Sequence, residues 1–336
     1  MGLSTVAIAL LPGFSTIGVL APILLVVIRI IQGLSAGGQY ANLLVVTVEN
    51  KDLKNKGFYS GIAIAVSLIG FLLASGTSYL VLKFCPPELV HYAWRITFLI
   101  GGALLAIYLL VIRSELQSHE NVDVSTTAKP NTNTYLELWR NHKVSFLIVI
   151  SFSAALGMMF YIDFVYFITY FTKFDHMTLS QSLSLNTISL LFACVMYPLF
   201  GLLSDKYGRA KMTLYGLLMH VVLLYPAFHL VLSHETANII AGLLILTTLG
   251  CWVQGAITPI FSEIYPTKLR SSGCCASYGI GAAISGFSPM LATQLNHQFF
   301  NGFIYIFIFA LVVGLACTAT LLLRKKERQQ LTAQQA

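Results

Sequence analysis

Charge is the scarcest property of this sequence. Only 10% of the 336 residues are Asp, Glu, Lys or Arg, whereas 57% are hydrophobic. Because a soluble domain carries about 25% charged residues, the composition excludes an ordinary soluble fold. Stretches such as 96–112 and 301–323 are almost free of charge and long enough to cross a hydrocarbon core of about 30 Å as helices. The sequence therefore predicts an all-α, polytopic membrane protein.

Motifs for cross-links, metals and enzymatic chemistry are lacking as well. The six cysteines lie mostly inside apolar runs and form no C-x-x-C pair, which argues against a disulfide framework or a zinc site. No G-x-x-x-x-G-K-[ST] sequence occurs, so a P-loop that would use ATP is not predicted. No apolar run holds H-E-x-x-H or a pair of aspartates. We expect no enzymatic activity, no metal and no cofactor.

The formal net charge of +7 has its explanation in topology. When the apolar segments are alternated across a membrane from the basic C-terminal RKKER (324–328), sixteen of the 20 Lys and Arg residues fall on one side. Such a bias marks the cytoplasmic side. We therefore expect a multi-pass protein of the bacterial inner membrane, with the C-terminus in the cytoplasm and with no nucleic-acid partner.

Ten apolar segments are separated by charged or Pro- and Gly-containing breaks. They are 1–17, 20–48, 58–82, 93–112, 144–171, 179–203, 212–232, 237–262, 272–296 and 301–323. The polar stretch between the fourth and fifth segments reads as a cytoplasmic linker. The predicted domains are an N-terminal bundle (1–112), this linker (113–143), a six-helix C-terminal bundle (144–323) and a cytoplasmic tail (324–336).

The densest cluster of charge is GLLSDKYGRAK, residues 201–211. Its spacing, G-x-x-x-D-K-x-G-R-x-K, resembles the cytoplasmic loop motif of the major facilitator superfamily, and Ala210 departs from it where a base is usual. RIIQGLSAGG (29–38) resembles the motif of the superfamily's fourth helix, and SEIYPTKLRSSG (262–273) resembles the loop after its tenth. With WRITFLIGG (94–102), these stretches are similar to the metabolite:H⁺ symporter family of proline/betaine, dicarboxylate and aromatic-acid carriers.

The resemblance implies two six-helix bundles around a central cavity, one rocking against the other. In that alignment the first segment corresponds to the family's third helix, so the first two helices and the first copy of the loop motif are expected to be absent. The resemblance also implies a cytoplasmic gate in which Asp205 leans on the start of the fifth helix at Lys56-Gly57. The gate residues are Gly201, Asp205, Lys206, Gly208, Arg209, Glu263 and Arg270.

Arg29 is the main candidate for binding a substrate. It stands near mid-span, where an unpaired charge costs about 2.5–3.5 kcal/mol. At 100° per residue, Gln32 and Gln39 lie about 60° and about 80° from it on the same helix side. A cavity-facing polar stripe that binds a carboxylate is one interpretation, and a structural Arg that bonds to backbone carbonyls is the other. Gln39 stands where many members of the family carry Glu.

Asp163 is the one acid deep inside an apolar segment. Burial favours the neutral form of a carboxyl group, which suits a proton carrier. Helical spacing also places Phe160, Tyr166, Phe167 and Tyr170 on its face, and such a surface suits an ammonium group. Alternatively, the aromatic residues form an interfacial belt and Asp163 pairs with another helix.

Trp252 and Gln254, in the equivalent of the tenth helix, and Tyr278, in the next, either line the cavity or simply pack. The sequence predicts a monomeric secondary transporter, coupled to H⁺ or Na⁺, for a small metabolite of the proline/betaine or mono- and dicarboxylate class. The competing hypothesis is a non-transporting protein, either an N-terminally truncated remnant or a membrane scaffold or sensor.

Overall fold

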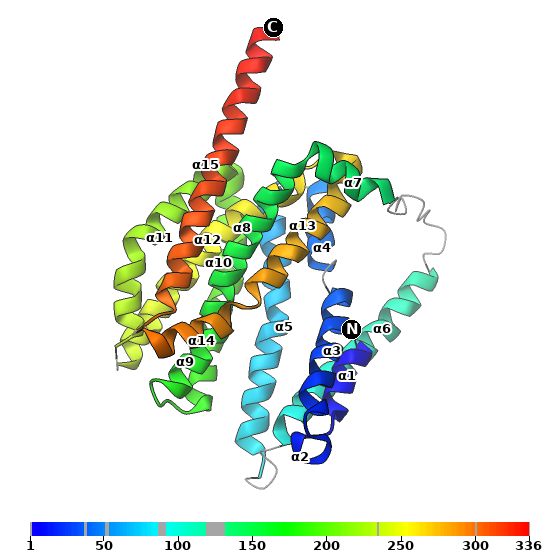
Figure 1. The fold of residues 1–336 in the computed structure, drawn as a ribbon, viewed down its shortest axis with the longest axis vertical. Coiled ribbons are helices and arrows are strands. Elements are labelled where there is room, and N and C mark those ends of the chain that lie inside the picture. Colours follow the sequence, from blue (N-terminus) through cyan, green and yellow to red (C-terminus); the bar gives the residue numbers. More distant parts are fainter. Residues whose placement is uncertain are drawn as a thin grey trace. The chain divides into compact units, whose positions relative to one another are not determined.

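The computed structural model is helical throughout the part of the chain that it describes, residues 2–36, 39–50, 54–86, 92–118, 132–233, 235–299 and 301–335 (Figure 1). The helices of the first half are α1 (Gly2–Leu10), α2 (Phe14–Ile17), α3 (Leu20–Ala36), α4 (Gln39–Glu49), α5 (Lys56–Phe84) and α6 (Ala93–Ser118). Those of the second half are α7 (Thr132–Asn141), α8 (Lys143–Tyr161), the π-turn η2 (Ile162–Tyr166), α9 (Phe167–Lys173), α10 (Leu179–Tyr207), α11 (Arg209–Val231), α12 (Thr236–Glu263), the 3₁₀ turn η3 (Thr267–Leu269), α13 (Arg270–Ser285), α14 (Ser288–Gln298) and α15 (Ile304–Gln335).

Six helical segments among the described residues are long and apolar enough to cross a membrane. They are Lys56–Val81, Lys143–Lys173, Leu179–Tyr207, Arg209–Val231, Thr236–Glu263 and Ile304–Leu323. Leu20–Gly33 and Ala93–Tyr108 are shorter apolar helices. The fold is thus an all-α bundle of apolar helices, and the number of ten spans stays a prediction.

Two predicted spans are interrupted where the sequence carries helix-breaking residues. The segment 1–17 divides into α1 and α2 around Pro12 and Gly13, because proline lacks the N–H that a continuing helix needs. The segment 272–296 divides into α13 and α14 between Ser285 and Ser288, directly before Pro289. The predicted linker (113–143) stays a prediction: α6 continues to Ser118 and α7 begins at Thr132, and residues 119–131 lie outside the described part.

The described residues form two compact units that do not follow chain order. Unit 1 holds Met1–Tyr40 and Leu73–Thr134, and unit 2 holds Ala41–Leu72 and Tyr135–Ala336. In unit 1, α1 packs against α6 and α3. In unit 2, the first half of α5 belongs with the helices that follow the linker. The predicted bundle boundaries, which follow the order of the chain, stay a prediction.

The core of unit 2 is built from apolar side chains of α8, α11, α12 and α15. These helices lie side by side, α8 and α11 against α15 and α11 against α12 (green to red in Figure 1). Phe303, directly before α15, and Phe307, in its first turn, are buried and meet the ring of Phe228 edge-on at 5.4 and 5.1 Å. Aromatic pairs in this geometry are favourable beyond their burial, so this part of unit 2 is a firmly packed scaffold.

Helix α10 is held between α5 and α12 at unusually short distances. A Cβ atom at Gly61 of α5 would lie 2.7 Å from Cα of Pro198, and one at Gly255 of α12 would lie 3.1 Å from the carbonyl oxygen of Tyr197. Glycine therefore permits both crossings. Helices α10 and α12 both carry residues of two sites described next, one around Asp205 and one around Asp163.

Candidate functional site

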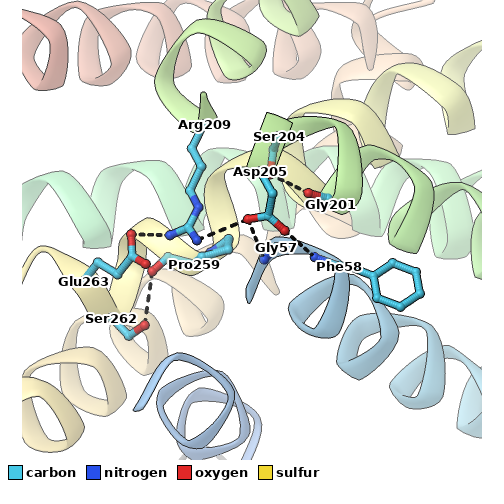
Figure 2. A network of polar contacts seen from close by, with 9 residues as sticks. All are labelled: Gly57, Phe58, Gly201, Ser204, Asp205, Arg209, Pro259, Ser262 and Glu263. Carbon is cyan, nitrogen blue, oxygen red and sulfur yellow. Dashed lines mark hydrogen bonds and ion pairs between the residues drawn. The ribbon is translucent and has the colours of Figure 1, made fainter. Parts of the chain in front are cut away.

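The C-terminal end of α10 holds the first turn of α5 through Asp205. Its Oδ1 accepts a hydrogen bond of 2.9 Å from the N–H of Gly57, and its Oδ2 accepts one of 3.1 Å from the N–H of Phe58 (Figure 2). N–H groups in the first turn of a helix have no partner within the helix, and the positive end of the helix dipole lies there. The carboxylate is thus an external cap for α5.

Two further charges extend this contact. Arg209, at the start of α11, lies 3.4 Å from Oδ1 of Asp205 and forms a second ion pair with Glu263 at the end of α12 (Figure 2). The side chains of Asp205 and Arg209 are only 14% and 17% exposed, so solvent screens this cluster less than an open surface pair. We call the set of Gly57, Phe58, Asp205, Arg209 and Glu263 the Asp205 latch.

The latch depends on glycine at two kinds of position, where two helices touch and where the chain turns with a positive φ. A Cβ atom at Gly57 would lie 2.9 Å from Oδ1 of Asp205 and would also meet the carbonyl oxygen of Gly201, so the two helices touch through backbone. Gly208 has φ +91°, a conformation that other residues rarely adopt, and it connects α10 to α11 in a single residue. Lys206 stays exposed, with its ammonium 5.4 Å from the ring of Tyr207.

Arg270 was predicted to join the same network, but within the described part of the chain it pairs with another acid. Its Nη1 lies 3.5 Å from Oε1 of Glu49, at the end of α4. Beside it, the hydroxyl of Ser271 donates to Oδ1 of Asn42 at 2.8 Å. The start of α13 is thereby tied to α4 by a contact separate from the latch.

The loop after α12 is fixed by Tyr265. This side chain is 2% exposed, and its hydroxyl donates to the hydroxyl of Ser277 at 2.9 Å. Burial raises the pKa of Tyr265 to about 12, so the phenol stays neutral at physiological pH. A Cβ atom at Gly273 would lie 2.9 Å from its ring, which explains why the stretch 262–273 combines a tyrosine with this glycine.

In unit 1, two of the three residues of the predicted polar stripe, Arg29 and Gln32, are hydrogen-bonded to each other. Nη1 of Arg29 donates to Oε1 of Gln32 at 3.1 Å, and Nε2 of Gln32 donates to the hydroxyl of Thr5 at 3.1 Å. The guanidinium also lies 5.4 Å from the centre of the Phe98 ring, and the Arg29 side chain is exposed. Gln39 is exposed at the start of α4; its helical phase relative to Arg29 depends on residues 37–38, which are not described.

Asp163 lies in the π-turn η2 and is 7% exposed. Within the described residues, its Oδ1 has no hydrogen-bond partner. It borders a small cavity, which we call the Asp163 cavity. The lining residues are Leu156, Met159, Phe160, Asp163, Phe164, Tyr197, Thr247, Gly250, Cys251 and Gln254.

The predicted aromatic face beside Asp163 is divided. Phe160 lines the Asp163 cavity, whereas Tyr166, Phe167 and Tyr170 are turned to Phe303, at ring distances of 5.5, 5.7 and 5.4 Å. The prediction of one shared face was wrong because it assumed α-helical spacing, and the π-turn adds a residue to one turn.

The three remaining candidates have different surroundings. Trp252 stacks on Phe200 at 5.2 Å, and its Nε1–H donates to the carbonyl of Met212 at 3.0 Å, which is a packing arrangement. Oε1 of Gln254 accepts a hydrogen bond of 2.8 Å from the hydroxyl of Tyr197, and both residues line the Asp163 cavity. Tyr278 is partly buried, with its ring 6.1 Å from that of Phe261.

Sequence reasoning did not find Tyr197, Asn42 or Glu49. Tyr197 stands directly before Pro198 in an apolar run. Because tyrosine counts as a hydrophobic aromatic residue, its hydroxyl group did not stand out there. Glu49 and Asn42 are separated by seven positions in α4, so a helical projection would have placed them on one face.

These observations define a class of protein. It is a polytopic helical membrane protein in which a charged latch joins two apolar helices. The sequence pattern of the family described as Major Facilitator Superfamily matches residues 1–274 and 176–335. The chain belongs to this superfamily.

Individual relatives are carriers of small molecules. A proline/betaine transporter of Salmonella typhimurium is 28% identical over 305 residues, 88% of this chain and 61% of the relative. An alpha-ketoglutarate permease of Escherichia coli is 31% identical over 290 residues, 85% of this chain and 66% of the relative. A citrate-proton symporter of Klebsiella pneumoniae is 25% identical over 301 residues, 88% of this chain and 67% of the relative. The chain thus spans roughly two thirds or less of their lengths.

Proposed function

We propose that the chain is a secondary active transporter that moves a small metabolite together with a proton by alternating access. The observation that carries the proposal is the Asp205 latch. A carboxylate that closes on free N–H groups of another helix makes a contact that can open and close without unfolding either helix. Such a contact suits a gate.

The gate is proposed to lie on the cytoplasmic side. The bases at Lys206, Arg209 and Lys211 fall on the same side as the tail when the apolar segments alternate, in accord with the positive-inside rule. In the closed gate the latch holds α5 to α10, and its opening exposes the pathway to the cytoplasm. The protein then works as a multi-pass monomer in a bacterial inner membrane.

Arg29 is proposed to bind the carboxylate of the solute. Its guanidinium is exposed and is oriented by Gln32 and Phe98, and a guanidinium pairs well with a carboxylate. The relatives named for proline/betaine, alpha-ketoglutarate and citrate suggest a substrate class whose members all carry carboxylate groups. Proton coupling accords with the name of the citrate-proton symporter.

The test is counterflow in proteoliposomes that contain the purified full chain. We expect vesicles loaded with proline, glycine betaine, 2-oxoglutarate or shikimate to exchange at least one of these solutes with its labelled form. Arg29→Gln should weaken the apparent affinity by about tenfold to a hundredfold, since a hydrogen bond to a charged group contributes about 1.5–3 kcal/mol.

Lys83→Gln is the matched control, because it removes one positive charge from an exposed residue of the same unit. Its exchange should equal that of the wild type. If the wild type exchanges none of the four solutes above the level of protein-free vesicles, transport of this substrate class is rejected and the scaffold or sensor hypothesis gains support.

A further inference from the structure

The helix that follows the linker changes its winding at Asp163. Between α8 and α9 the backbone makes one π-turn, Ile162–Tyr166. A π-turn inside a membrane helix places a wider loop of backbone where an α-helix would continue, and such turns are frequent at functional sites. Here it presents the carboxyl group of Asp163 to the cavity between α8, α10 and α12.

The Asp163 cavity is small and carries one ionisable acid. Its volume is about 10 Å³, which is room for about one water molecule. In this conformation it admits no metabolite and no quaternary ammonium group. The interpretation of Asp163 as an anchor for an organic cation therefore does not fit, because the three rings that would surround that cation pack on Phe303 instead.

No counter-charge faces Asp163 among the described residues. The elements packed on the π-turn are α8, α9, α10, α12 and α14. Their titratable groups that line the cavity are the phenol of Tyr197 and the thiol of Cys251. Helix α14 supplies no lining residue, and its His297 lies against the ring of Phe174 at 5.4 Å; Tyr170 of α9 lies on Phe303.

An ionised carboxylate in this place is costly. A buried charge without a partner loses the solvation of water and gains no ion pair. Transfer of a proton from a hydronium ion to Oδ1 breaks one O–H bond of the hydronium and forms one O–H bond on the carboxyl group, which leaves a neutral water molecule and a neutral acid. The cavity has space for the one water molecule that would bring or take this proton, and the polar atoms of Tyr197 and Gln254 lie on its wall.

We propose that Asp163 is the residue that binds and releases the coupling proton. This inference rests on the proposed function and specifies its ion site. The walls of the cavity also connect it to the gate: α10 carries both Tyr197 and Asp205, and α12 carries both Gln254 and Glu263. A change of charge at Asp163 thus acts on the same two helices that form the Asp205 latch.

The site itself is tested without any solute, by infrared difference spectroscopy of the reconstituted wild type at acid and alkaline pH. We expect the carbonyl stretching band of a protonated carboxyl group at acid pH, its loss at alkaline pH, and its absence in Asp163→Asn. The control Asp175→Asn, which alters an acid outside the cavity, should keep the band. A wild type whose band does not depend on Asp163 overturns the proposal.

The coupling is tested by two transport modes in the same vesicles. Asp163→Asn should keep the counterflow of a solute that the wild type exchanges, and should lose its uphill accumulation under an inwardly directed proton gradient. Uphill accumulation retained in Asp163→Asn overturns the proton site while the transporter stands. Accumulation driven by a sodium gradient alone, with no pH difference, overturns it too. If Asp163→Asn does not assemble, Asp163→Ser replaces it.

The two tests separate the two proposals. A wild type that exchanges no solute rejects the proposed transport of these substrates, and the infrared band at Asp163 then still decides whether the residue exchanges a proton. A wild type that exchanges a solute but shows no such band rejects the proton site alone.

Discussion

Asp205 and Asp163 are carboxyl groups of the same compact unit in opposite surroundings. Asp205 accepts two backbone hydrogen bonds and lies beside an arginine. Asp163 is more deeply buried, and its Oδ1 has no partner in the described part of the chain. The first arrangement stabilises a charge and the second stabilises its removal. The same side chain is thus suited to a mechanical contact at one site and to proton exchange at the other.

The largest effect is expected from Gly57→Ala, which inserts a methyl group into the latch. Overpacking costs about 1–3 kcal/mol, and the displaced helix loses the hydrogen bonds to Asp205, worth about 1.5–3 kcal/mol. We expect the free energy of unfolding to fall by about 3 kcal/mol or more, measured by thermal unfolding in detergent.

Gly70→Ala is the control on the same helix, since a Cβ atom there meets nothing within 4 Å. It should leave stability unchanged or raise it by up to about 1 kcal/mol, because alanine favours the helix. Equal losses for the two variants would show that the short distance between α5 and α10 has no energetic role.

A smaller effect is expected from Asp205→Asn, which keeps the shape of the side chain and removes its charge. The amide can accept only one of the two N–H groups, so the latch is weakened by about 1.5–3 kcal/mol. We expect faster thiol labelling of Ser204→Cys, a buried position beside the latch, in a background without the six native cysteines. Labelling at the wild-type rate would contradict a gate at this contact.

The smallest effect, of opposite sign, is expected from Asp163→Asn. Removing the buried charge of a carboxyl group whose Oδ1 has no hydrogen-bond partner in the described part of the chain does not cost stability and can increase it. The apparent melting temperature should therefore stay equal to that of the wild type or rise. A fall as large as that of Asp205→Asn would mean that the Asp163 carboxylate is stabilised by a partner, and the contrast between the two acids would disappear.

The latch was the part of the site most accessible from sequence. The resemblance of residues 201–211 to the superfamily's loop motif implied a contact with the helix start at Lys56-Gly57, and α5 does begin at Lys56. The ends of α12 likewise fell within a residue of the predicted segment 237–262. Charge is scarce in apolar helices, so the positions of charged residues carry much information.

The Asp163 cavity was less predictable for a physical reason. Helical projection assumes 3.6 residues per turn, and no residue between Ile162 and Tyr166 marks the change to a π-turn. The partners of Arg270 were missed in a similar way, because the approach of Glu49 depends on how α4 and α13 pack and not on spacing along the chain.

The π-turn gives the length of this helix a meaning of its own. It holds one residue more than a uniform α-helix needs over the same rise. Deletion of any one residue from Ile162 to Tyr166 would restore α-helical winding and leave α9 in nearly the same orientation relative to α8. Phe167 and Phe171 would keep their places in the core, whereas the wider turn that presents Asp163 to its cavity would be lost. In an alignment of relatives, a gap of one residue would remove this acid site more completely than any substitution.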